Sequence, residues 1–425
     1  METPGHYRPR LIDSSVNELL RVTGAVAIEG PKWCGKTWTA MTHAASAIWV
    51  ADPSGDYLTR RIATSDPFSL LESEKPLLID EWQDAPGLWD AVRLAVDRKP
   101  GAGQYLLTGS ATPRAGTVSH SGTGRIARLE MWPMTLAEVD KSSGEVSLAS
   151  VMNGEWPKVT PGVWTLHELL DAILRGGWPG MVDAALADAT QLAASYLRSV
   201  AYADATMLDG IRRDPKRLIA LLSSLSRNTA TSVSITTLTR DMAEADSQAL
   251  SNKSAAAYLD VLRRLHVLRE IPAWSPALRS PVRLRVTPKR ILCDPSLAAA
   301  GLRASAEALM ADRKTLGLLF ETLCLRDLAV YAEAMGAALA YYHDDAELEA
   351  DAIVQAGDGR WMGIEIKLGA EQETSAADTL LALRRKMTAS GEREPAALMV
   401  VTGVDSFPHR RDDGVIVVPI NRLGP

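Results

Sequence analysis

Apolar positions along the chain fall into two patterns, short runs of strand length and longer stretches with helical spacing. In the first third, mainly apolar runs at residues 26–28, 48–50, 76–81 and 105–110 predict strands. Residues 10–22 carry apolar side chains three and four positions apart, which predicts an amphipathic helix before the first strand. Strands that alternate with helices are typical of an α/β domain.

The middle of the chain has a weaker pattern. Residues 141–165 are rich in Ser, Gly, Pro and Lys, and we interpret them as a linker or insertion. A short helix is expected at residues 167–174, before a rigid turn at residues 176–180 to which we assign no chemistry. A longer amphipathic helix is expected at residues 192–208. Its apolar side is expected to consist of Tyr196, Leu197, Val200 and Met207.

Helical spacing dominates residues 215–271, and strand patterns dominate the end of the chain. The first region is expected to hold three helices, at residues 218–225, from residue 234 onward and at residues 251–268. The second region is expected to hold helices at residues 316–335 and 375–387 and strands at residues 337–343, 349–355, 361–368, 397–401 and 415–419.

Composition limits the class of protein. A chain of 425 residues is too long for one ordinary core and suggests roughly two to four domains. Its 46% hydrophobic and 23% charged content is typical of a soluble globular protein. Because the formal net charge is −6, the molecule as a whole does not attract nucleic acid, and any such contact requires a local basic face.

Cysteine content and hydropathy predict the compartment. The three cysteines, Cys34, Cys293 and Cys324, are far apart and have no metal-ligand spacing, which suits a reducing compartment and argues against structural zinc. Residues 1–10 lack a signal-peptide core, and no window reaches the ~18 apolar residues of a membrane span. We therefore expect a cytoplasmic protein without a membrane contact.

Residues 30–37, with the sequence GPKWCGKT, match the phosphate-binding pattern G-x-x-x-x-G-K-[ST] in every position. They follow a strand and open a helix expected at residues 37–47, so backbone N–H groups would point at one phosphate. Lys36 would neutralise the β- and γ-phosphates, and the Thr37 hydroxyl would hold Mg²⁺. The alternative is an ordinary Gly/Pro turn. The expected nucleotide-binding residues are Gly30, Pro31, Lys32, Trp33, Cys34, Gly35, Lys36, Thr37 and Trp38.

Carboxylates and hydroxyls end the two strands that follow. The strand at residues 76–81 ends in Asp80 and Glu81, although such a pair also arises by chance. We assign Asp80 to the magnesium shell and Glu81 to the attacking water as general base. If the strand at residues 105–110 lies between the strands of these two motifs, Thr108 or Ser110 would contact the γ-phosphate or the water. Otherwise these hydroxyls merely end a strand.

The order of these motifs resembles the additional-strand catalytic-glutamate class of P-loop ATPases, and within it the AAA superfamily. Residues 124–138, with a G-R pair and the pattern P-x-[ST]-x-x-E, resemble one branch of bacterial and archaeal ATP-binding proteins. The C-terminal half of that branch is a domain of unknown function. The resemblance implies a parallel sheet, Mg²⁺-dependent ATP hydrolysis, and a trans-acting finger or sensor at Arg125, with Arg128 behind it. A plain surface arginine is equally compatible with the pattern.

The three helices expected within residues 215–271 resemble a winged-helix unit. Such a unit is a DNA-binding module in some proteins and a protein-contact or lid module in ATPases. Between Asp260 and Arg290, basic residues outnumber acids eight to two and would form a face for a phosphate backbone, or simply a solvated surface. The basic residues are Arg263, Arg264, Arg269, Arg279, Arg283, Arg285, Lys289 and Arg290, and the acids are Asp260 and Glu270.

Acidic residues and a lysine occur in a characteristic order near the end of the chain. Glu365 and Lys367 lie two apart on one expected strand and so share a face, and Asp351 joins them if the neighbouring strands pair. With Glu321 on the preceding helix, this order resembles the PD-(D/E)xK nuclease superfamily, although the proline before Asp351 is absent. The resemblance implies Mg²⁺ on Asp351 and Glu365, a supporting Glu321, and Lys367 orienting water. A degenerate, non-cutting fold is the alternative.

We therefore expect an α/β, multi-domain chain with a P-loop AAA-type ATPase domain at residues 1–140, a linker and helical lid at 141–214, a winged-helix-like domain at 215–292 and a restriction-endonuclease-like α/β domain at 293–425. The expected function is Mg²⁺-dependent ATP hydrolysis that drives a nucleic-acid-directed C-terminal domain. The alternative is a nucleotide-dependent switch or scaffold that binds a protein partner and has an inactive nuclease-like domain. The ligands and partners considered are ATP or ADP with Mg²⁺, DNA, a protein partner and further copies of the chain.

Overall fold

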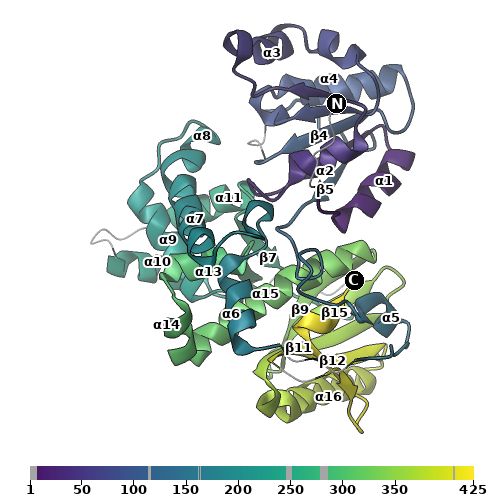
Figure 1. Ribbon diagram of the computed structural model, residues 1–425, viewed down its shortest axis with the longest axis vertical. Helices are drawn as coiled ribbons and strands as arrows, with labels where there is room; N and C mark the ends of the chain where they lie inside the picture. Colours follow the sequence, from purple (N-terminus) through teal and green to yellow (C-terminus); the bar gives the residue numbers. More distant parts are fainter. Residues whose placement is uncertain are drawn as a thin grey trace. The chain divides into compact units, whose positions relative to one another are not determined.

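The computed structural model describes residues 7–112, 116–160, 162, 164–245, 251–277, 286–404 and 407–425, and these form two compact units (Figure 1). We call Met1–Pro133, Ala203–Arg213 and Asp260–Val267 together the N-terminal unit. The C-terminal unit consists of Met134–Tyr202, Asp214–Leu259 and Leu268–Pro425. No helix in the described part of the chain is both long and apolar enough to cross a membrane.

A five-stranded parallel sheet forms the centre of the N-terminal unit, and its strand order is β2-β3-β4-β1-β5. The fourth strand of the sequence therefore lies between the first and the third. As a result, the carboxyl ends of β1, β3 and β4 are neighbours at one edge of the sheet. The strands are β1 (Ala25–Glu29), β2 (Ser46–Trp49), β3 (Leu77–Asp80), β4 (Tyr105–Gly109) and β5 (Ile126–Glu130).

Alternate residues of each strand point to opposite sides of this sheet, and helices cover both faces. On one face, Ala27 and Ile79 belong to a core cluster with Trp89 of α4. On the other face, Ile28 belongs to a cluster with Val16 of α1. Burial of apolar side chains on both faces explains why the strands read as short uninterrupted apolar runs. The helices of this region are α1 (Ile12–Val22), α2 (Lys36–His43), α3 (Ser54–Ser65) and α4 (Gly87–Arg98).

Two segments from later in the sequence complete the N-terminal unit. Asp209 forms ion pairs with Arg213 at 2.8 Å and with Arg264 at 3.3 Å, and these bonds join the two segments to each other. Arg264 also exchanges hydrogen bonds with Thr112: its carbonyl accepts from Thr112 N at 2.8 Å, and its Nε donates to Thr112 O at 3.1 Å. The N-terminal unit therefore includes residues from far along the chain, a feature that no local pattern indicates.

A six-stranded mixed sheet forms the end of the C-terminal unit, in the order β13-β14-β12-β11-β10-β9. Neighbours β11 and β12 are parallel, whereas β9, β10 and β11 are antiparallel to one another in turn. α15 (Arg313–Ala334) packs against β9, β10 and β11, and α16 (Glu373–Ala389) packs against β10, β11 and β12. The strands are β9 (Ala337–His343), β10 (Glu349–Ala356), β11 (Trp361–Gly369), β12 (Ala397–Val404), β13 (His409–Arg410) and β14 (Ile416–Pro419).

Helices make up most of the remainder of this unit. Three successive helices are followed by an antiparallel pair of strands, β7 (Leu268–Ile271) and β8 (Lys289–Leu292). This order is the one expected of a winged-helix unit, and that assignment stays a prediction. The helices are α6 (Leu166–Arg175), α7 (Leu186–Ser199), α9 (Pro215–Arg227), α10 (Ile235–Ala245), α11 (Asn252–Arg264), α13 (Pro295–Leu302) and α14 (Ala306–Ala311). The end of α11, from Asp260 onward, belongs to the N-terminal unit.

Two features of the middle segment differ from the sequence interpretation. The stretch interpreted as a linker contains β6 (Val146–Ser147), which pairs with β15 (Leu423–Gly424), and the helix α5 (Leu148–Met152). Its few apolar residues are buried, but the surrounding Ser, Gly and Pro mask the signal. The structure also corrects the placement of Met207, which is 76% exposed instead of lying on a buried helix face. A π-helical turn at Val200–Asp204 changes the direction of side chains after it.

A buried network of charged groups joins four segments of the C-terminal unit. The guanidinium of Arg326 forms ion pairs with Asp294 at 2.9 Å and Asp327 at 2.7 Å. Asp327 accepts a hydrogen bond from the backbone N of Leu136 at 3.0 Å, and Asp294 accepts one from the N of Gly177 at 2.9 Å. The expected turn at residues 176–180 is thus bound to the start of α13, which supports a structural role for it.

Candidate functional site

The loop of residues 30–37 connects β1 to α2, and its backbone is shaped for close approach. A Cβ atom on Gly30 would lie 2.3 Å from the carbonyl oxygen of Met131, so only glycine fits there. Trp33 and Gly35 have positive φ angles of 70° and 103°. Because α2 begins at Lys36, its free N–H groups face the loop. The geometry is therefore that of an anion cradle at a helix N-terminus.

Lys36 and Cys34 have clear positions in this loop. The Nζ of Lys36 donates a 2.7 Å hydrogen bond to the carbonyl of Pro31, so the buried ammonium folds back over the loop. Cys34 is fully buried, with Sγ 4.0 Å from the carbonyl oxygen of Met131. This burial indicates a packing role for Cys34.

Two strands, β3 and β4, and the helix α2 bring hydroxyl and carboxylate groups together beside Lys36. The hydroxyls of Thr37 and Thr108 each donate a 2.7 Å hydrogen bond to the same oxygen, Oδ1 of Asp80. Burial raises the pKa of Asp80, while these two hydrogen bonds and the Lys36 charge oppose the rise. Thr37 and Asp80 supply the oxygen ligands that Mg²⁺ prefers, and the donor set fits that ion.

Glu81 is held in a fixed orientation next to Asp80. Its backbone has a positive φ of 55°, and its N–H donates to the Thr108 hydroxyl at 3.3 Å. Its carboxylate Oε2 accepts a 2.9 Å hydrogen bond from Ser110 and a further one from Gln83 Nε2. Both hydroxyl residues at the end of β4 therefore contact the acidic pair. Gln83 was missed by the sequence analysis, although its position two residues after Glu81 was a usable signal.

Arg10 and Lys32 form contacts that fix the position of the loop. The buried guanidinium of Arg10 donates to the carbonyls of Cys34 at 2.7 Å and Trp132 at 2.8 Å. The Nζ of Lys32 forms a 2.7 Å ion pair with Asp204, a residue in the segment Ala203–Arg213. Arg10 is 24 positions from Cys34, and Lys32 is 172 positions from Asp204, so spacing could not reveal either contact.

His266 is a buried imidazole close to the loop. Its Nδ1 lies 3.5 Å from a carboxylate oxygen of Glu130, the last residue of β5. Burial lowers the pKa of His266 to about 4; the carboxylate of Glu29 opposes the change, and the charges of Lys36 and Arg128 add to it. At neutral pH the imidazole is therefore uncharged. Nothing in the local sequence distinguishes this histidine from a surface one.

The structure corrects the role of Arg125 within its own chain. Arg125 directly precedes β5, and its carbonyl accepts a 3.0 Å hydrogen bond from Ala25 N at the amino end of β1. Its Nε forms a 2.8 Å ion pair with Asp97. This edge of the sheet is opposite the loop, so Arg125 cannot act as a sensor for its own site, and a trans-acting role stays a prediction. Arg128 lies nearer to the loop. Its guanidinium forms a 2.7 Å ion pair with Glu29, the residue directly before Gly30.

The residues of the C-terminal constellation also lie together. The Nζ of Lys367 is 2.5 Å from Glu365 Oε2 and 3.4 Å from Asp351 Oδ2, as expected for two side chains on one face of β11 beside β10. Glu321 on α15 does not bond these groups directly. It is bound instead to Lys289, whose Nζ lies 2.8 Å from Glu321 Oε1 and 3.3 Å from Asp351 Oδ1.

Burial changes the protonation of the acids in this constellation. It raises the pKa of Glu321 to about 8 and that of Glu365 to about 7, and the nearby charge of Asp351 adds to both shifts. The lysine charges hold the pKa of Asp351 below its usual range against the effect of burial. Among the described residues, no group of three or more His, Cys, Asp or Glu side chains is arranged to hold a metal ion.

The structure also corrects the expected basic face. Arg269, Lys289 and Arg290 are buried, so these side chains are not exposed to a phosphate backbone. Arg290 bonds Glu270 at 2.9 Å within the β7–β8 pair, and Arg264 bonds Asp209. The antiparallel pairing of β7 and β8 places Arg269, Lys289 and Arg290 inside the unit, where Lys289 and Arg290 form ion pairs with carboxylates. Arg279, Arg283 and Arg285 lie outside the described residues.

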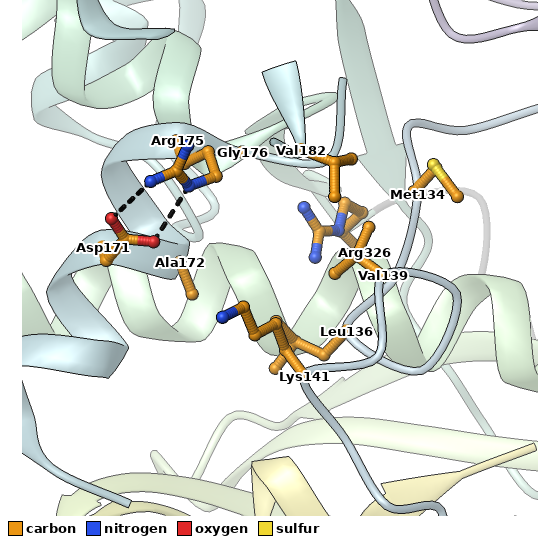
Figure 2. A pocket seen from close by; sticks show the side chains of 10 residues that line it. All are labelled: Met134, Leu136, Val139, Lys141, Asp171, Ala172, Arg175, Gly176, Val182 and Arg326. Carbon is orange, nitrogen blue, oxygen red and sulfur yellow. Dashed lines mark hydrogen bonds and ion pairs between the residues drawn. The ribbon is translucent and has the colours of Figure 1, made fainter. Parts of the chain in front are cut away.

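A small cavity in the C-terminal unit is not a substrate site. Its volume is about 20 Å³, enough for one water molecule. Figure 2 shows Arg175 turned toward Asp171, with which it forms a 2.8 Å ion pair, so the charge of Arg175 is already neutralised. The lining residues are Met134, Leu136, Val139, Lys141, Asp171, Ala172, Arg175, Gly176, Val182 and Arg326.

Comparison with known families agrees with the geometry of the N-terminal unit. Residues 23–140, which include the whole five-stranded sheet, match the family model described as an AAA domain. This part of the chain is therefore similar to AAA domains. Residues 166–308 and 316–423 match two further models, each described as a domain of unknown function.

Similar whole chains are known from mycobacteria. Two proteins, one from Mycobacterium bovis and one from Mycobacterium tuberculosis, are each 26% identical over 403 residues, and both are called uncharacterized. The match covers 94% of this chain and 80% of each relative. A solved structure described as the Walker-type ATPase of Pyrococcus abyssi covers 68% of this chain and 94% of its own, with 11% identity and a TM-score of 0.40, a likeness too low to bear on the fold.

Proposed function

We propose that this protein is a Mg²⁺-dependent ATPase that binds ATP at the loop of residues 30–37. The observation that carries the proposal is the convergence of Lys36, Thr37, Asp80 and Thr108 at the carboxyl ends of β1, β3 and β4. An ammonium group, a hydroxyl and a carboxylate beside a helix N-terminus are the groups that a magnesium-bound triphosphate requires.

Each residue of this set has its own task in the proposal. The N–H groups of the loop and of the first turn of α2 bind phosphate oxygens. Lys36 leaves the carbonyl of Pro31 and pairs with the β- and γ-phosphates. Thr37 and Asp80 would hold Mg²⁺, and the bound ion would neutralise charge on the phosphate oxygens.

Glu81 is the proposed general base. Its carboxylate is oriented by the hydroxyl of Ser110 and the amide of Gln83, so one of its oxygens is fixed and the other can accept a proton from water. Thr108 links the two acids, because it donates to Asp80 and accepts from the backbone N–H of Glu81. The positions of the magnesium ligand and of the base are therefore coupled.

Phosphate release and nucleotide binding, measured side by side, test this assignment. Lys36→Ala is expected to abolish ATP binding, whereas Glu81→Gln is expected to keep binding and lose turnover by about 100-fold or more. Arg61→Ala, which removes an exposed charge from α3, is the control and leaves both unchanged. Hydrolysis retained in both site variants would refute the proposal.

The finer part of the proposal concerns what ATP turnover drives. We assign the C-terminal unit to binding of a partner, nucleic acid or protein, without cutting it. The observation in favour is that Asp351, Glu365 and Glu321 are each bound to a lysine. Supercoiled plasmid incubated with ATP and Mg²⁺ or Mn²⁺ is expected to stay intact. Metal-dependent cleavage that disappears in Lys367→Ala, with ATP hydrolysis unchanged, would establish a nuclease instead.

The proposal extends to an assembly of several copies. Arg125 lies on the far edge of its own sheet, so it reaches a nucleotide only if that nucleotide belongs to another copy. In that case Arg125→Ala lowers turnover and leaves ATP binding intact, and the rate per chain rises with protein concentration. Activity that is independent of both the variant and the concentration would exclude a finger at this position.

A further inference from the structure

The ammonium group of Lys289 lies at the point where three carboxylates of the C-terminal unit converge. Its Nζ is 2.8 Å from Glu321 Oε1, 3.0 Å from Glu349 Oε1 and 3.3 Å from Asp351 Oδ1. These acids come from α15 and β10, and Lys289 itself begins β8. The lysine side chain is only 3% exposed. Its position is therefore built into the packing of three elements.

We propose that Lys289 is the resident cation of this cluster, so that Asp351, Glu321 and Glu349 form a permanently filled cation site in place of a divalent metal site. The resemblance to metal-dependent nucleases places Mg²⁺ on Asp351 and Glu365, and the arrangement does not fit that ion. This inference concerns the C-terminal unit and does not depend on ATP hydrolysis.

Hydrogen-bond capacity supports the assignment. A lysine ammonium has three N–H donors. Here it donates to Glu321 Oε1 at 2.8 Å and to Asp351 Oδ1 at 3.3 Å, and it forms an ion pair with Glu349 Oε1 at 3.0 Å. The second oxygen of Asp351 is also engaged, since Oδ2 accepts from Ile366 N at 2.8 Å. Glu365 is held by Lys367 at 2.5 Å. Every acid that would bind the metal thus already has a cationic partner.

Coordination chemistry explains why a metal does not simply replace the lysine. Mg²⁺ requires near-octahedral oxygen ligands at about 2.0–2.1 Å, much shorter than the contacts of an ammonium group. To bind there, the ion would have to displace Lys289 from a buried position. The displaced charge would then lie in the interior without a partner, which is strongly unfavourable.

Binding of Mn²⁺ to the nucleotide-free full-length protein, followed by the electron paramagnetic resonance of free Mn²⁺, tests this inference. The wild-type protein and Asp351→Asn are expected to give the same binding curve, because no ion binds at the cluster. Lys289→Met, which keeps the length of the side chain and removes the charge, is expected to gain one Mn²⁺ site. That site is lost again in the double variant Lys289→Met/Asp351→Asn.

Thermal unfolding gives a second readout on the same proteins. Lys289→Met is expected to be destabilised and then to recover by roughly 2–4 °C or more with Mn²⁺, whereas the wild type does not respond. If Lys289→Met does not fold, the comparison of wild type with Asp351→Asn still decides. A wild-type site for Mn²⁺ that Asp351→Asn removes, or a folded Lys289→Met that gains none, would overturn the assignment. ATP binding serves as a separate check on the N-terminal unit and is expected to be unchanged in Lys289→Met.

Discussion

The hydroxyl of Thr37 donates a 2.7 Å hydrogen bond to Oδ1 of Asp80, and this bond joins the first turn of α2 to the end of β3. The two motifs of the nucleotide site, 43 positions apart in sequence, are thus in direct contact. Both side chains offer oxygen atoms, so together they would hold a magnesium ion in place of this hydrogen bond. The groups that hold the metal are already oriented toward each other by this contact.

Thr37→Ala should therefore weaken magnesium use more than ATP binding. Removing one group that bonds a charged partner raises the activation free energy by ~1.5–3 kcal/mol, which lowers the rate by about 10- to 100-fold. We expect kcat to fall by this factor and the Mg²⁺ concentration for half-maximal rate to rise. Phosphate release measured over a range of Mg²⁺ concentrations gives both quantities. Thr37→Ser keeps the hydroxyl and should stay within a few-fold of wild type; equal loss in both variants would contradict the metal-ligand role.

Thr108→Val should separate turnover from binding. The change removes the donor to Asp80 and the acceptor for Glu81 N–H but preserves the side-chain shape. Groups that orient a metal ligand typically contribute 10- to 100-fold to activity, so a loss of about this size in kcat is expected with nearly unchanged ATP affinity. Isothermal titration calorimetry and steady-state kinetics measure the two quantities. Wild-type kcat in Thr108→Val would show that the coupling of the two acids has no catalytic role.

His266 should make the N-terminal unit sensitive to mild acid. Its folded pKa of about 4 lies below its usual value of 6.5, because burial disfavours the charged ring. The unfolded chain therefore binds more protons between these values, and stability falls as pH decreases from 6.5 toward 4. The neighbouring charges are those of Glu29, Lys36, Arg128 and Glu130.

The size of this effect can be measured against a non-titrating variant. Each pKa unit corresponds to ~1.4 kcal/mol, so the contribution of His266 is on the order of 3 kcal/mol across the window. Urea unfolding of wild type and His266→Gln at pH 7.5 and pH 5 gives the change in the free energy of unfolding with pH for each protein. His266→Gln should lose less stability between the two pH values than wild type. Identical pH dependence in both would show that His266 is solvated or charged in the folded protein.

Gly177→Ala should destabilise the C-terminal unit. A Cβ atom there would lie 2.0 Å from the carbonyl oxygen of Met134, which is backbone and has little freedom to move. Overpacking of this kind costs about 1–3 kcal/mol or more. Gly180→Ala in the same turn is the matched control, because a Cβ at that position meets nothing within 4 Å. Scanning calorimetry should show a lower transition for Gly177→Ala alone; equal behaviour of the two variants would disprove the close contact.

Local patterns predicted much of the secondary structure and of the nucleotide loop. The helix expected at residues 316–335 is α15, and the strands around Asp351 and Glu365 are β10 and β11 within one or two residues. Periodicity is sufficient here because each element buries a long apolar face. The phosphate loop was predictable for a different reason, since its glycines and lysine must occur at fixed spacing to surround a phosphate.

Roles that depend on distant contacts were not predictable. Arg125 follows a family pattern, but only the register of β5 against β1 reveals that it lies at the wrong edge for its own site. Lys289 reads as one charge in a basic stretch, yet its environment is set by Glu321 and Asp351, 32 and 62 positions away. Composition gives the number of charges in a segment, but folding decides which of them face water.

The indole rings of Trp33 and Trp38 lie on either side of Lys36 in sequence, and they are 59% and 48% exposed. Tryptophan emission responds to contact with water, so a molecule held in the loop would alter the light emitted by these two rings. The protein thus contains its own optical reporter at the position where ATP is proposed to bind. Affinity for unmodified nucleotides can be followed by intrinsic fluorescence, without attaching a dye to either partner.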